Sequence, residues 1–371
     1  MRASSLLALG LGIVGLSALL PACEDSNKRK DPPPPPPHSA YLEAPASSGV
    51  TVDPAQVAAF AGLPARFESP KNALTDEKIA LGKMLYFEAR LSKNQQISCN
   101  SCHDLAKYGV DGEKTSPGHK GQRGNRNSPT TLNAAAHVAQ FWDGRAPDVE
   151  AQATKPITNP GEMALANDQA IVTVLESMPE YADAFKKAFP GDTPALTVVN
   201  VGKAIGAFER TLATSSRFDA FTKGDAKALS DAEKAGFQKF LSVGCNTCHS
   251  TATFGGTEYK KLGQAKPYPP LAEGKDIGRE AVTKQATDRH SFKVASLRNV
   301  EKTGPYLHDG SVATLEQAVK LMGSYQLGKD LSDADVASIV TFLKTLTAEP
   351  LKIDPPKLPA STTKTPKPAA G

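Results

Sequence analysis

The sequence lacks the excess of positive charge that a nucleic-acid partner would require. Its 371 residues contain 43 Lys and Arg against 39 Asp and Glu, which gives a net charge of +4. Removal of an N-terminal leader containing Arg2 would leave +3, and the C-terminal tail, with four lysines against Asp354, carries all of that. Because nucleic-acid-binding domains present a basic patch, we expect no nucleic-acid partner.

Long apolar runs are also lacking. A membrane-spanning helix needs roughly 20 apolar residues, and the run from Leu6 to Leu20 is shorter. It follows Arg2 and ends in small residues before Cys23, which is the pattern of a secretory signal peptide over residues 1–22. The ending Leu20-Pro21-Ala22-Cys23 resembles a bacterial lipobox, so Cys23 is a candidate lipid anchor. Cleavage without lipidation and a transmembrane anchor are the alternatives.

Both ends of the chain lack the periodic apolar pattern of a packed domain. Residues 23–44 contain six consecutive prolines and predict an extended linker. Residues 350–371 are rich in Pro, Lys and Thr and predict a disordered tail. We therefore expect the folded part to span residues 45–349.

Cysteine is scarce, and its placement is informative. After Cys23, the remaining four cysteines form two C-x-x-C-H motifs, Cys99 to His103 and Cys245 to His249, and none is left for a disulfide framework. Two thiols at this spacing can add across the two vinyl groups of one haem, and the adjoining histidine can ligate the iron. The motifs predict two covalently bound haems c, attached through Cys99, Cys102, Cys245 and Cys248, with His103 and His249 on the irons.

Two other uses of paired cysteines compete with haem attachment. A four-cysteine zinc site usually has its pairs about 15 to 20 residues apart, and the gap here is far longer. A thioredoxin-like redox pair needs a βαβ context. Neither alternative requires a histidine after each pair, so haem attachment is favoured.

Strand-like alternation is scarce, which favours an all-α fold. Apolar residues three and four apart predict amphipathic helices over 198–212 and 336–343. Ser230 with Glu233, and Thr314 with Gln317, have the spacing of capping boxes. We predict two cytochrome c-like haem domains in tandem, residues 45–222 and 223–349, with irregular or β-hairpin insertions.

Few side chains can face the irons opposite the motif histidines. Met322 lies on a predicted short helix, where an ordinary core methionine is the alternative. His119 lies in a glycine-flanked loop, where a solvated histidine is the alternative. Trp142 is the only tryptophan and would by default anchor the core. Glu162 would by default be a helix-start carboxylate.

Several further motifs match one family in order. The chain resembles the bacterial di-haem cytochrome c peroxidases from about Thr75 to Leu346. Besides the two haem motifs, the matching segments are Leu81-Gly82-Lys83-Met84-Leu85-Tyr86-Phe87, Arg126-Asn127-Ser128-Pro129-Thr130, Phe141-Trp142-Asp143-Gly144-Arg145-Ala146, Glu162-Met163, Pro305-Tyr306-Leu307-His308 and Met322-Gly323-Ser324.

The resemblance implies that the two haems divide the work. The C-terminal haem, with His249 and Met322 as ligands, would receive electrons. The N-terminal haem, held by His103, would be the peroxide site, capped at rest by His119. His119 would leave when the electron-entry haem is reduced. The related quinone-cofactor maturases carry tyrosine where this chain has Met322, and that difference favours a peroxidase.

The resemblance also assigns roles to residues around the haems. Glu162 matches a distal acid–base carboxylate that moves a proton between the two peroxide oxygens, and Gln152 matches a polar neighbour. Trp142 matches an aromatic residue between the haems, and His308 matches a residue near their interface. A calcium site is implied at Asn127 and the backbone carbonyls of Thr303 and Pro305.

The resemblance further implies how the protein works in its surroundings. We expect a periplasmic homodimer, tethered to the membrane if Cys23 is lipidated. It would reduce hydrogen peroxide to water with electrons from a small c-type cytochrome or cupredoxin. Two alternatives remain: a peroxide-using oxidase of a protein or organic substrate, and a non-catalytic two-haem electron carrier.

The cysteine motifs make a direct prediction about stoichiometry. Exported protein should give a pyridine haemochrome signal equal to two haems per chain, because each C-x-x-C-H motif attaches one. The Cys245→Ser/Cys248→Ser variant should retain one. A wild-type signal of one haem or none would contradict the interpretation of both motifs.

Overall fold

The computed structural model describes residues 49–369. The predicted signal peptide (1–22), the lipid site at Cys23 and the linker (23–44) lie outside the described residues. Within residues 49–369, no helix is both long and apolar enough to cross a membrane.

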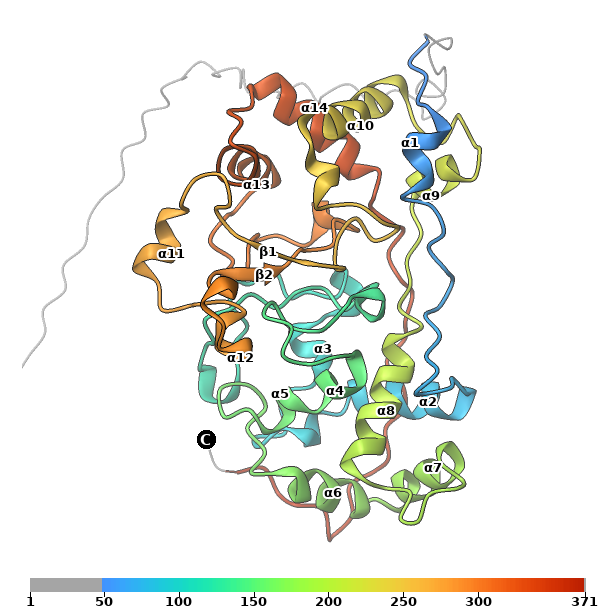
Figure 1. The fold of residues 1–371 in the computed structure, drawn as a ribbon. Coiled ribbons are helices and arrows are strands. Elements are labelled where there is room, and N and C mark those ends of the chain that lie inside the picture. Colours follow the sequence, from blue (N-terminus) through green and yellow to red (C-terminus); the bar gives the residue numbers. More distant parts are fainter. Residues whose placement is uncertain (1–48, 370–371) are drawn as a thin grey trace, which may run out of the picture. The chain divides into compact units, whose positions relative to one another are not determined.

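The described residues form many short helices and one pair of strands (Figure 1). The α-helices are α1 (Pro54–Ala58), α2 (Asp76–Tyr86), α3 (Cys99–Cys102), α4 (Val149–Ala153), α5 (Lys155–Thr158), α6 (Asp168–Glu176), α7 (Pro179–Ala188), α8 (Val198–Glu209), α9 (Arg217–Thr222), α10 (Asp231–Val243), α11 (Pro269–Glu273), α12 (Glu280–Thr283), α13 (Leu315–Leu321) and α14 (Asp333–Lys344). The 3₁₀ turns are η2 (Ala89–Leu91), η3 (Leu105–Lys107), η4 (His119–Gly121), η5 (Ala134–Ala136), η6 (Cys245–Thr247), η7 (Ala286–Asp288) and η8 (Val300–Lys302), and η9 (Met322–Gln326) is a π turn.

The strands are β1 (Tyr259–Lys261) and β2 (Ser291–Lys293), which pair antiparallel with Tyr259 opposite Lys293. The expected helical fold with minor β content is confirmed. The two strands are joined by residues 262–290, which include α11 and α12, so the pair is not a tight hairpin.

The first apolar core forms around α2 and α8. The predicted apolar stripe of α8 is confirmed, since Val201, Ile205 and Phe208 are buried there. The two helices approach very closely at Gly82, where a Cβ atom would lie 1.8 Å from the backbone oxygen of Ala204. Any larger residue at position 82 would push α2 away from α8. The first core in turn supports α3, which carries the first haem motif and packs against the core through Cys99.

The second apolar core forms around α10 and α14. Phe237 of α10 and Phe342 of α14 have ring centroids 5.1 Å apart, and both rings pack with Phe218. The capping boxes predicted at Ser230 and Thr314 are both present, so α10 and α13 begin where the sequence indicates. The second haem motif begins directly after α10.

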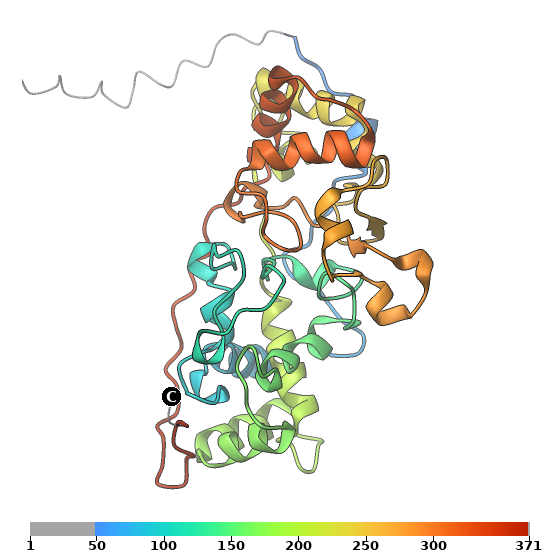
Figure 2. The ribbon, with the colours of Figure 1, turned by 90° about the vertical axis from the view of Figure 1, so that its left-hand side faces the viewer.

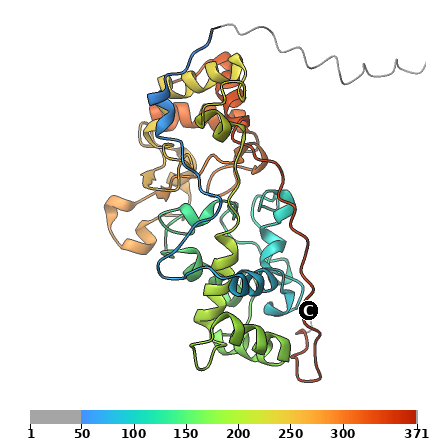
Figure 3. The same ribbon diagram turned by 90° about the vertical axis from the view of Figure 1, so that its right-hand side faces the viewer.

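The second core includes segments that precede residue 222. Val57 from α1, Phe60 just after it, and Phe218 from α9 pack in the second core. The chain then runs from α1 at the second core to α2 at the first, as Figures 1 and 3 show. The boundary near residue 222 stays a prediction, and the structure adds that the aromatic side chains of Phe60 and Phe218 pack in the core around α10 and α14.

The C-terminal tail is also ordered where it was predicted to be disordered. Residues 350–369 run from the end of the α14 segment along the first core (Figure 2). Leu351 and Ile353 pack against that core, and Gln95 donates a hydrogen bond to the carbonyl of Pro366 at 2.6 Å. Proline restricts the unfolded chain, so such a segment loses little entropy on docking and few contacts suffice to hold it. Composition alone does not reveal these contacts.

A buried ion pair joins α9 to the chain that follows β2. Arg298 is 1% exposed, and its Nη2 donates to the Asp219 carboxylate at 2.8 Å. Arg298 also donates to the carbonyl of Ala252, so its guanidinium is well satisfied. Breaking such a pair by removing one partner leaves an uncompensated buried charge.

We expect Asp219→Ala to lower the free energy of unfolding by about 3–5 kcal/mol, because Arg298 would remain buried without its counter-charge. Denaturant unfolding of the haem-loaded protein would measure this. The control is Asp183→Ala, which removes an exposed pair with Lys186 and should cost under about 1 kcal/mol. Equal effects of the two variants would contradict the assignment.

Candidate haem and peroxide sites

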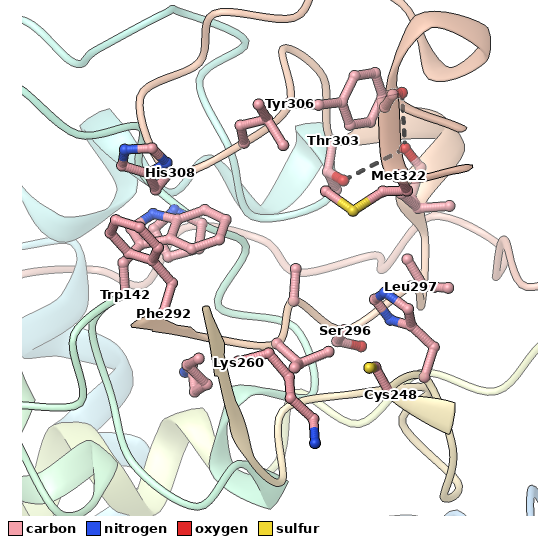
Figure 4. A pocket seen from close by; sticks show the side chains of 18 of the residues that line it. Trp142, Cys248, Lys260, Phe292, Ser296, Leu297, Thr303, Tyr306, His308 and Met322 are labelled. Carbon is pink, nitrogen blue, oxygen red and sulfur yellow. Dashed lines mark hydrogen bonds between the residues drawn. The ribbon is translucent and has the colours of Figure 1, made fainter. Parts of the chain in front are cut away.

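A large pocket lies between the second haem motif and Met322. Cys245, Cys248 and His249 line one side, and Met322 lines the other, at the junction of α13 and η9. Figure 4 shows the Cys248 and Met322 side chains on opposite sides of an open space. The remaining lining is mainly apolar and includes Phe240, Leu262, Phe292, Val294, Leu297, Val300, Leu315, Val319, Ile339 and Leu343.

Local backbone geometry presents the ligands of this pocket. Gly244 ends α10 with a φ of 99°, a left-handed conformation that glycine adopts at low cost, and η6 then carries Cys245. The Nδ1 of His249 lies 3.0 Å from the carbonyl oxygen of Phe254. If Nδ1–H donates to that carbonyl, Nε2 is left as the metal-binding nitrogen. Burial lowers the pKa of His249, which favours the neutral imidazole that binds metals.

Met322 is held at an irregular point of the chain. It ends α13 and begins the π turn η9, a kind of local distortion that is frequent at functional sites. In Figure 4 it lies beside Thr303 and Tyr306, whose hydroxyls both donate to the carbonyl of Val300 at 3.4 and 3.0 Å.

These residues fit a covalent haem better than a zinc ion. Cys99 packs against the first core and Cys245 against the second, so the two cysteine pairs do not converge on one ion. Across residues 49–369, no cluster of three or more His, Cys, Asp or Glu side chains could hold a metal. A mainly apolar pocket between an imidazole and a thioether suits a haem.

The first haem motif sits on α3. Ser98 caps this helix through a capping box with Ser101, and the hydroxyl of Tyr86 donates to the carbonyl of His103 at 2.7 Å. The Nδ1 atoms of His103 and His119 are both buried and have no hydrogen-bond partner in the described part of the chain. Buried ring nitrogens without a protein partner are consistent with histidines that bind a metal or cofactor.

His119 and Glu162 are held together by the backbone. The amide of His119 donates to the carbonyl of Glu162 at 2.7 Å. The approach depends on Gly118, where a Cβ atom would lie 1.9 Å from the carbonyl oxygen of Gly161. Sequence reasoning selected His119 and Glu162 separately, and the structure brings them side by side.

The Glu162 carboxyl is largely buried. Burial raises its pKa, an effect opposed by the charge of Arg145 and by the Asn159 amide, which donates to Oε1 at 2.9 Å. The charge of Glu162 contributes to raising the pKa of Cys102, so this carboxyl lies near the first haem motif. A carboxyl poised in this way is suited to exchanging protons.

Trp142, Asn127 and His308 form a connected group beside the large pocket. The indole Nε1 of Trp142 donates to the carbonyl of Asn127 at 2.9 Å, and the amide of Asn127 donates to the carbonyl of His308 at 2.8 Å. The His308 ring stacks on Phe292 with centroids 4.1 Å apart. Figure 4 shows Trp142, Phe292 and His308 together at one end of the pocket.

The remaining candidates are placed less tightly. Asn127, Thr303 and Pro305 all line the large pocket, so the three proposed calcium ligands lie in one region. The side-chain amide of Asn127 donates from Nδ2 to the carbonyl of Glu113 at 3.0 Å. Gln152 lies on α4 and is half-buried.

Sequence reasoning missed Lys293, which lines the same pocket. Its Nζ donates to the carbonyl of Ala139 at 2.7 Å and lies 3.3 Å from the Nδ1 of His137. Burial lowers the pKa of Lys293 to about 8, and no carboxylate of residues 49–369 pairs with it. Its position between the apolar residues Phe292 and Val294 carried no signal. A buried cation without a counter-charge suits a carboxylate such as a haem propionate.

Sequence reasoning also missed a charged network. Arg126 bridges Asp143 and Asp276 at 2.7 Å each, and Asp276 lies 3.9 Å from the His308 Nε2. Asp276 is far from Arg126 in sequence, so no local pattern could have paired them.

Comparisons with known proteins agree with this site. A family model described as di-haem cytochrome c peroxidase matches residues 76–227. The cytochrome c551 peroxidase of Nitrosomonas europaea is 46% identical over 305 residues, covering 82% of this chain and 89% of that protein. The cytochrome c551 peroxidase of Pseudomonas aeruginosa is 45% identical over 298 residues, covering 80% and 86%. A solved MauG-like protein associated with microbial copper homeostasis aligns with a TM-score of 0.68 at 28% identity, covering 77% of this chain and 93% of that one.

Glu209 is a buried acid near the first haem motif. It is 5% exposed, its carboxyl has no hydrogen-bond partner in the described residues, and its charge adds to the effect of burial in raising the pKa of Cys99 to about 12. Burial, helped by the charge of Glu150, raises the pKa of Glu209 from 4.5 to about 8. The protonated form therefore stabilises the fold at low pH, and this contribution is lost as pH rises through about 8.

We expect Glu209→Gln to remove that part of the pH dependence and to make the protein more stable than wild type above about pH 8. Denaturant unfolding between about pH 4 and pH 9, a range that spans both pKa values, would measure it. Glu176→Gln, on an exposed position of α6, is the matched control. Parallel stability curves for wild type and Glu209→Gln would show that Glu209 ionises freely in the folded state.

Proposed function

Since the chain belongs to the di-haem cytochrome c peroxidase family, we propose that it reduces hydrogen peroxide to water with electrons from a small redox protein. It is an enzyme of the cytochrome c peroxidase type and carries haem c. The observation that carries the specific proposal is the backbone hydrogen bond between His119 and Glu162 beside the first haem motif. It supports a site in which His119 would be a removable ligand and Glu162 a proton-exchanging carboxyl.

The proposal assigns the haem modules as two tandem domains. His103 would hold the peroxidatic haem, with His119 as its removable ligand. His249 and Met322 would hold the electron-entry haem, and Lys293 would receive one of its propionates. When bound, the haems supply single-electron storage and an iron position open to peroxide. The apolar lining of the large pocket and the thioether of Met322 support a high potential at the second site.

Glu162 is the proposed acid–base residue. Its carboxylate would take a proton from one oxygen of hydrogen peroxide and give it to the other oxygen, which then leaves as water. Two electrons and one further pair of protons complete the reduction to two waters. The Asn159 amide fixes the orientation of the carboxylate, and burial keeps its pKa raised so that it exchanges protons readily. Gln152 is proposed as a polar neighbour.

Trp142 is the proposed link for electrons between the two sites. It lies at one end of the large pocket and is fixed by Asn127, which also contacts His308 through the backbone. We also propose a calcium ion bound by oxygens of Asn127, Thr303 and Pro305. It would tie the segment around Trp142 to the second half of the chain.

The proposal places the protein in the periplasm, as a homodimer that accepts electrons from a c-type cytochrome or cupredoxin. The signal-peptide pattern of residues 1–22 supports export, and the lipobox-like ending supports an anchor at Cys23.

Replacement of Glu162 by Gln tests the catalytic assignment. We expect Glu162→Gln to lower peroxide turnover by about 100-fold or more, because the amide cannot exchange a proton. In wild type, kcat/KM should fall toward acid with an apparent pKa above 4.5, and the variant should lose that limb. Initial rates with reduced cytochrome c against pH would measure both.

The same assay separates the alternatives. Both haem spectra should be unchanged in Glu162→Gln, and Glu176→Gln should behave as wild type. Full activity of Glu162→Gln would remove Glu162 from the mechanism. Wild-type consumption of reduced cytochrome c without any organic substrate would exclude an obligate oxidase, and absence of any turnover would favour an electron carrier.

A further inference from the structure

The ordered C-terminal tail ends beside the segment that supports the Glu162 loop. We call residues 350–369 the C-terminal strap. Its first part is fixed by Leu351 and Ile353, which pack against the first core. Its lysines, Lys352, Lys357, Lys364 and Lys367, are exposed. These apolar side chains therefore face the protein while the lysines face solvent, which is the pattern of a docked segment. Figure 2 shows the course of the strap along the first core.

The last part of the strap contacts the N-terminal half at several points. Thr362 donates from its hydroxyl to the carbonyl of Ser177 at 2.7 Å, and the hydroxyls of Ser177 and Thr365 lie 3.0 Å apart. Arg90 donates to the hydroxyl of Ser361 at 3.0 Å. These contacts reach the end of α6 and the turn η2.

The most consequential contacts involve residues 92–97. The strap holds this segment from one side: Gln95 donates to the carbonyl of Pro366 at 2.6 Å, and Ala369 donates from its amide to the carbonyl of Lys93 at 3.0 Å. From the other side, the amide of Lys93 donates to the carbonyl of Met163 at 2.8 Å. Lys93 is thus bonded through its two backbone groups to the strap and to the residue next to Glu162.

The same segment leads directly into the first haem motif. Ile97 is buried, and Ser98 caps the helix that carries Cys99. A shift of residues 92–97 would therefore move two things at once: the Met163 carbonyl that ends the Glu162 loop, and the approach to α3. A catalytic carboxyl is sensitive to displacements of this kind, since a 1 Å error can cost about 100-fold in rate.

We infer that the C-terminal strap is a positioning element for Glu162, acting through Lys93 and Met163. The inference rests on the proposed role of Glu162 in the peroxidase reaction. The strap touches no proposed catalytic side chain itself, and its exposed lysines are not needed for the effect.

The test is a chain that ends at Ala360, prepared with both haems and compared with the full chain. This truncation removes the contacts to Arg90, Lys93, Gln95 and Ser177 but keeps the packing of Leu351 and Ile353. Hydrogen exchange at the Lys93 amide should rise by about tenfold, because its partner segment is no longer clamped. Peroxide turnover should fall about 10- to 100-fold.

A pH profile distinguishes positioning from general stabilisation. Burial raises the pKa of Glu162, so a looser, better hydrated loop should move the acid limb of the rate profile toward lower pH. The haem content and the spectrum of the second haem should stay as in the full chain. The matched control is Lys364→Ala, which changes an exposed strap side chain and should leave every measurement unchanged.

Unchanged exchange at Lys93, or unchanged turnover and acid limb, would overturn the inference. If the truncated chain fails to retain haem, Gln95→Ala decides instead: it removes one strap contact in the intact chain and should produce the same changes on a smaller scale, and no change would overturn the inference. If the full chain showed no peroxide turnover, the proposed function would fail, while the Lys93 exchange rate would still report whether the strap orders this loop.

Discussion

One short backbone contact organises the first site: the loop of His119 lies against residues 161 and 162. Gly118 makes the approach sterically feasible, and the amide of His119 closes it by donating to the carbonyl of Glu162. The proposed removable iron ligand, His119, and the proposed acid–base carboxyl, Glu162, would otherwise sit on unrelated loops. Because the two share a peptide contact, movement of the histidine loop and the position of the carboxyl are mechanically coupled. A Cβ atom at position 118 would clash with the carbonyl oxygen of Gly161, so the contact requires glycine there.

The second site depends on a different constraint, the separation of the two proposed ligands, His249 and Met322, across a mainly apolar pocket. Gly244 turns the chain so that the second haem motif faces inward, and the π turn after α13 presents Met322 from the other side. Beside the second site, both hydrogen bonds of Trp142 are made to backbone groups. Its indole donates to the carbonyl of Asn127, and its own carbonyl accepts from the amide of Lys293. Packing against the apolar cluster that contains Phe292 adds to these two hydrogen bonds.

Local chemistry in the sequence predicted much of this arrangement. Capping boxes at Ser230 and Thr314, the apolar stripe of α8 and the two haem motifs depend on residues close together in the chain, and each is found as expected. Contacts between distant segments could not be predicted in this way. The pairing of Arg126 with Asp276, the burial of Lys293 and the membership of Phe60 in the second core have no local signature. The tail was misjudged because its composition is that of a disordered segment while its order comes from a surface elsewhere.

The distribution of aromatic residues in the second core has a consequence for synthesis. Phe60 stacks on Phe254, and both belong to the core that Phe342 completes. Phe60 belongs to an early segment of the chain, so it stays uncovered until nearly the whole polypeptide, including α14, has been synthesised. The first core contains no such late partner apart from Leu351 and Ile353. The first core can therefore close before the second, whose completion needs α14.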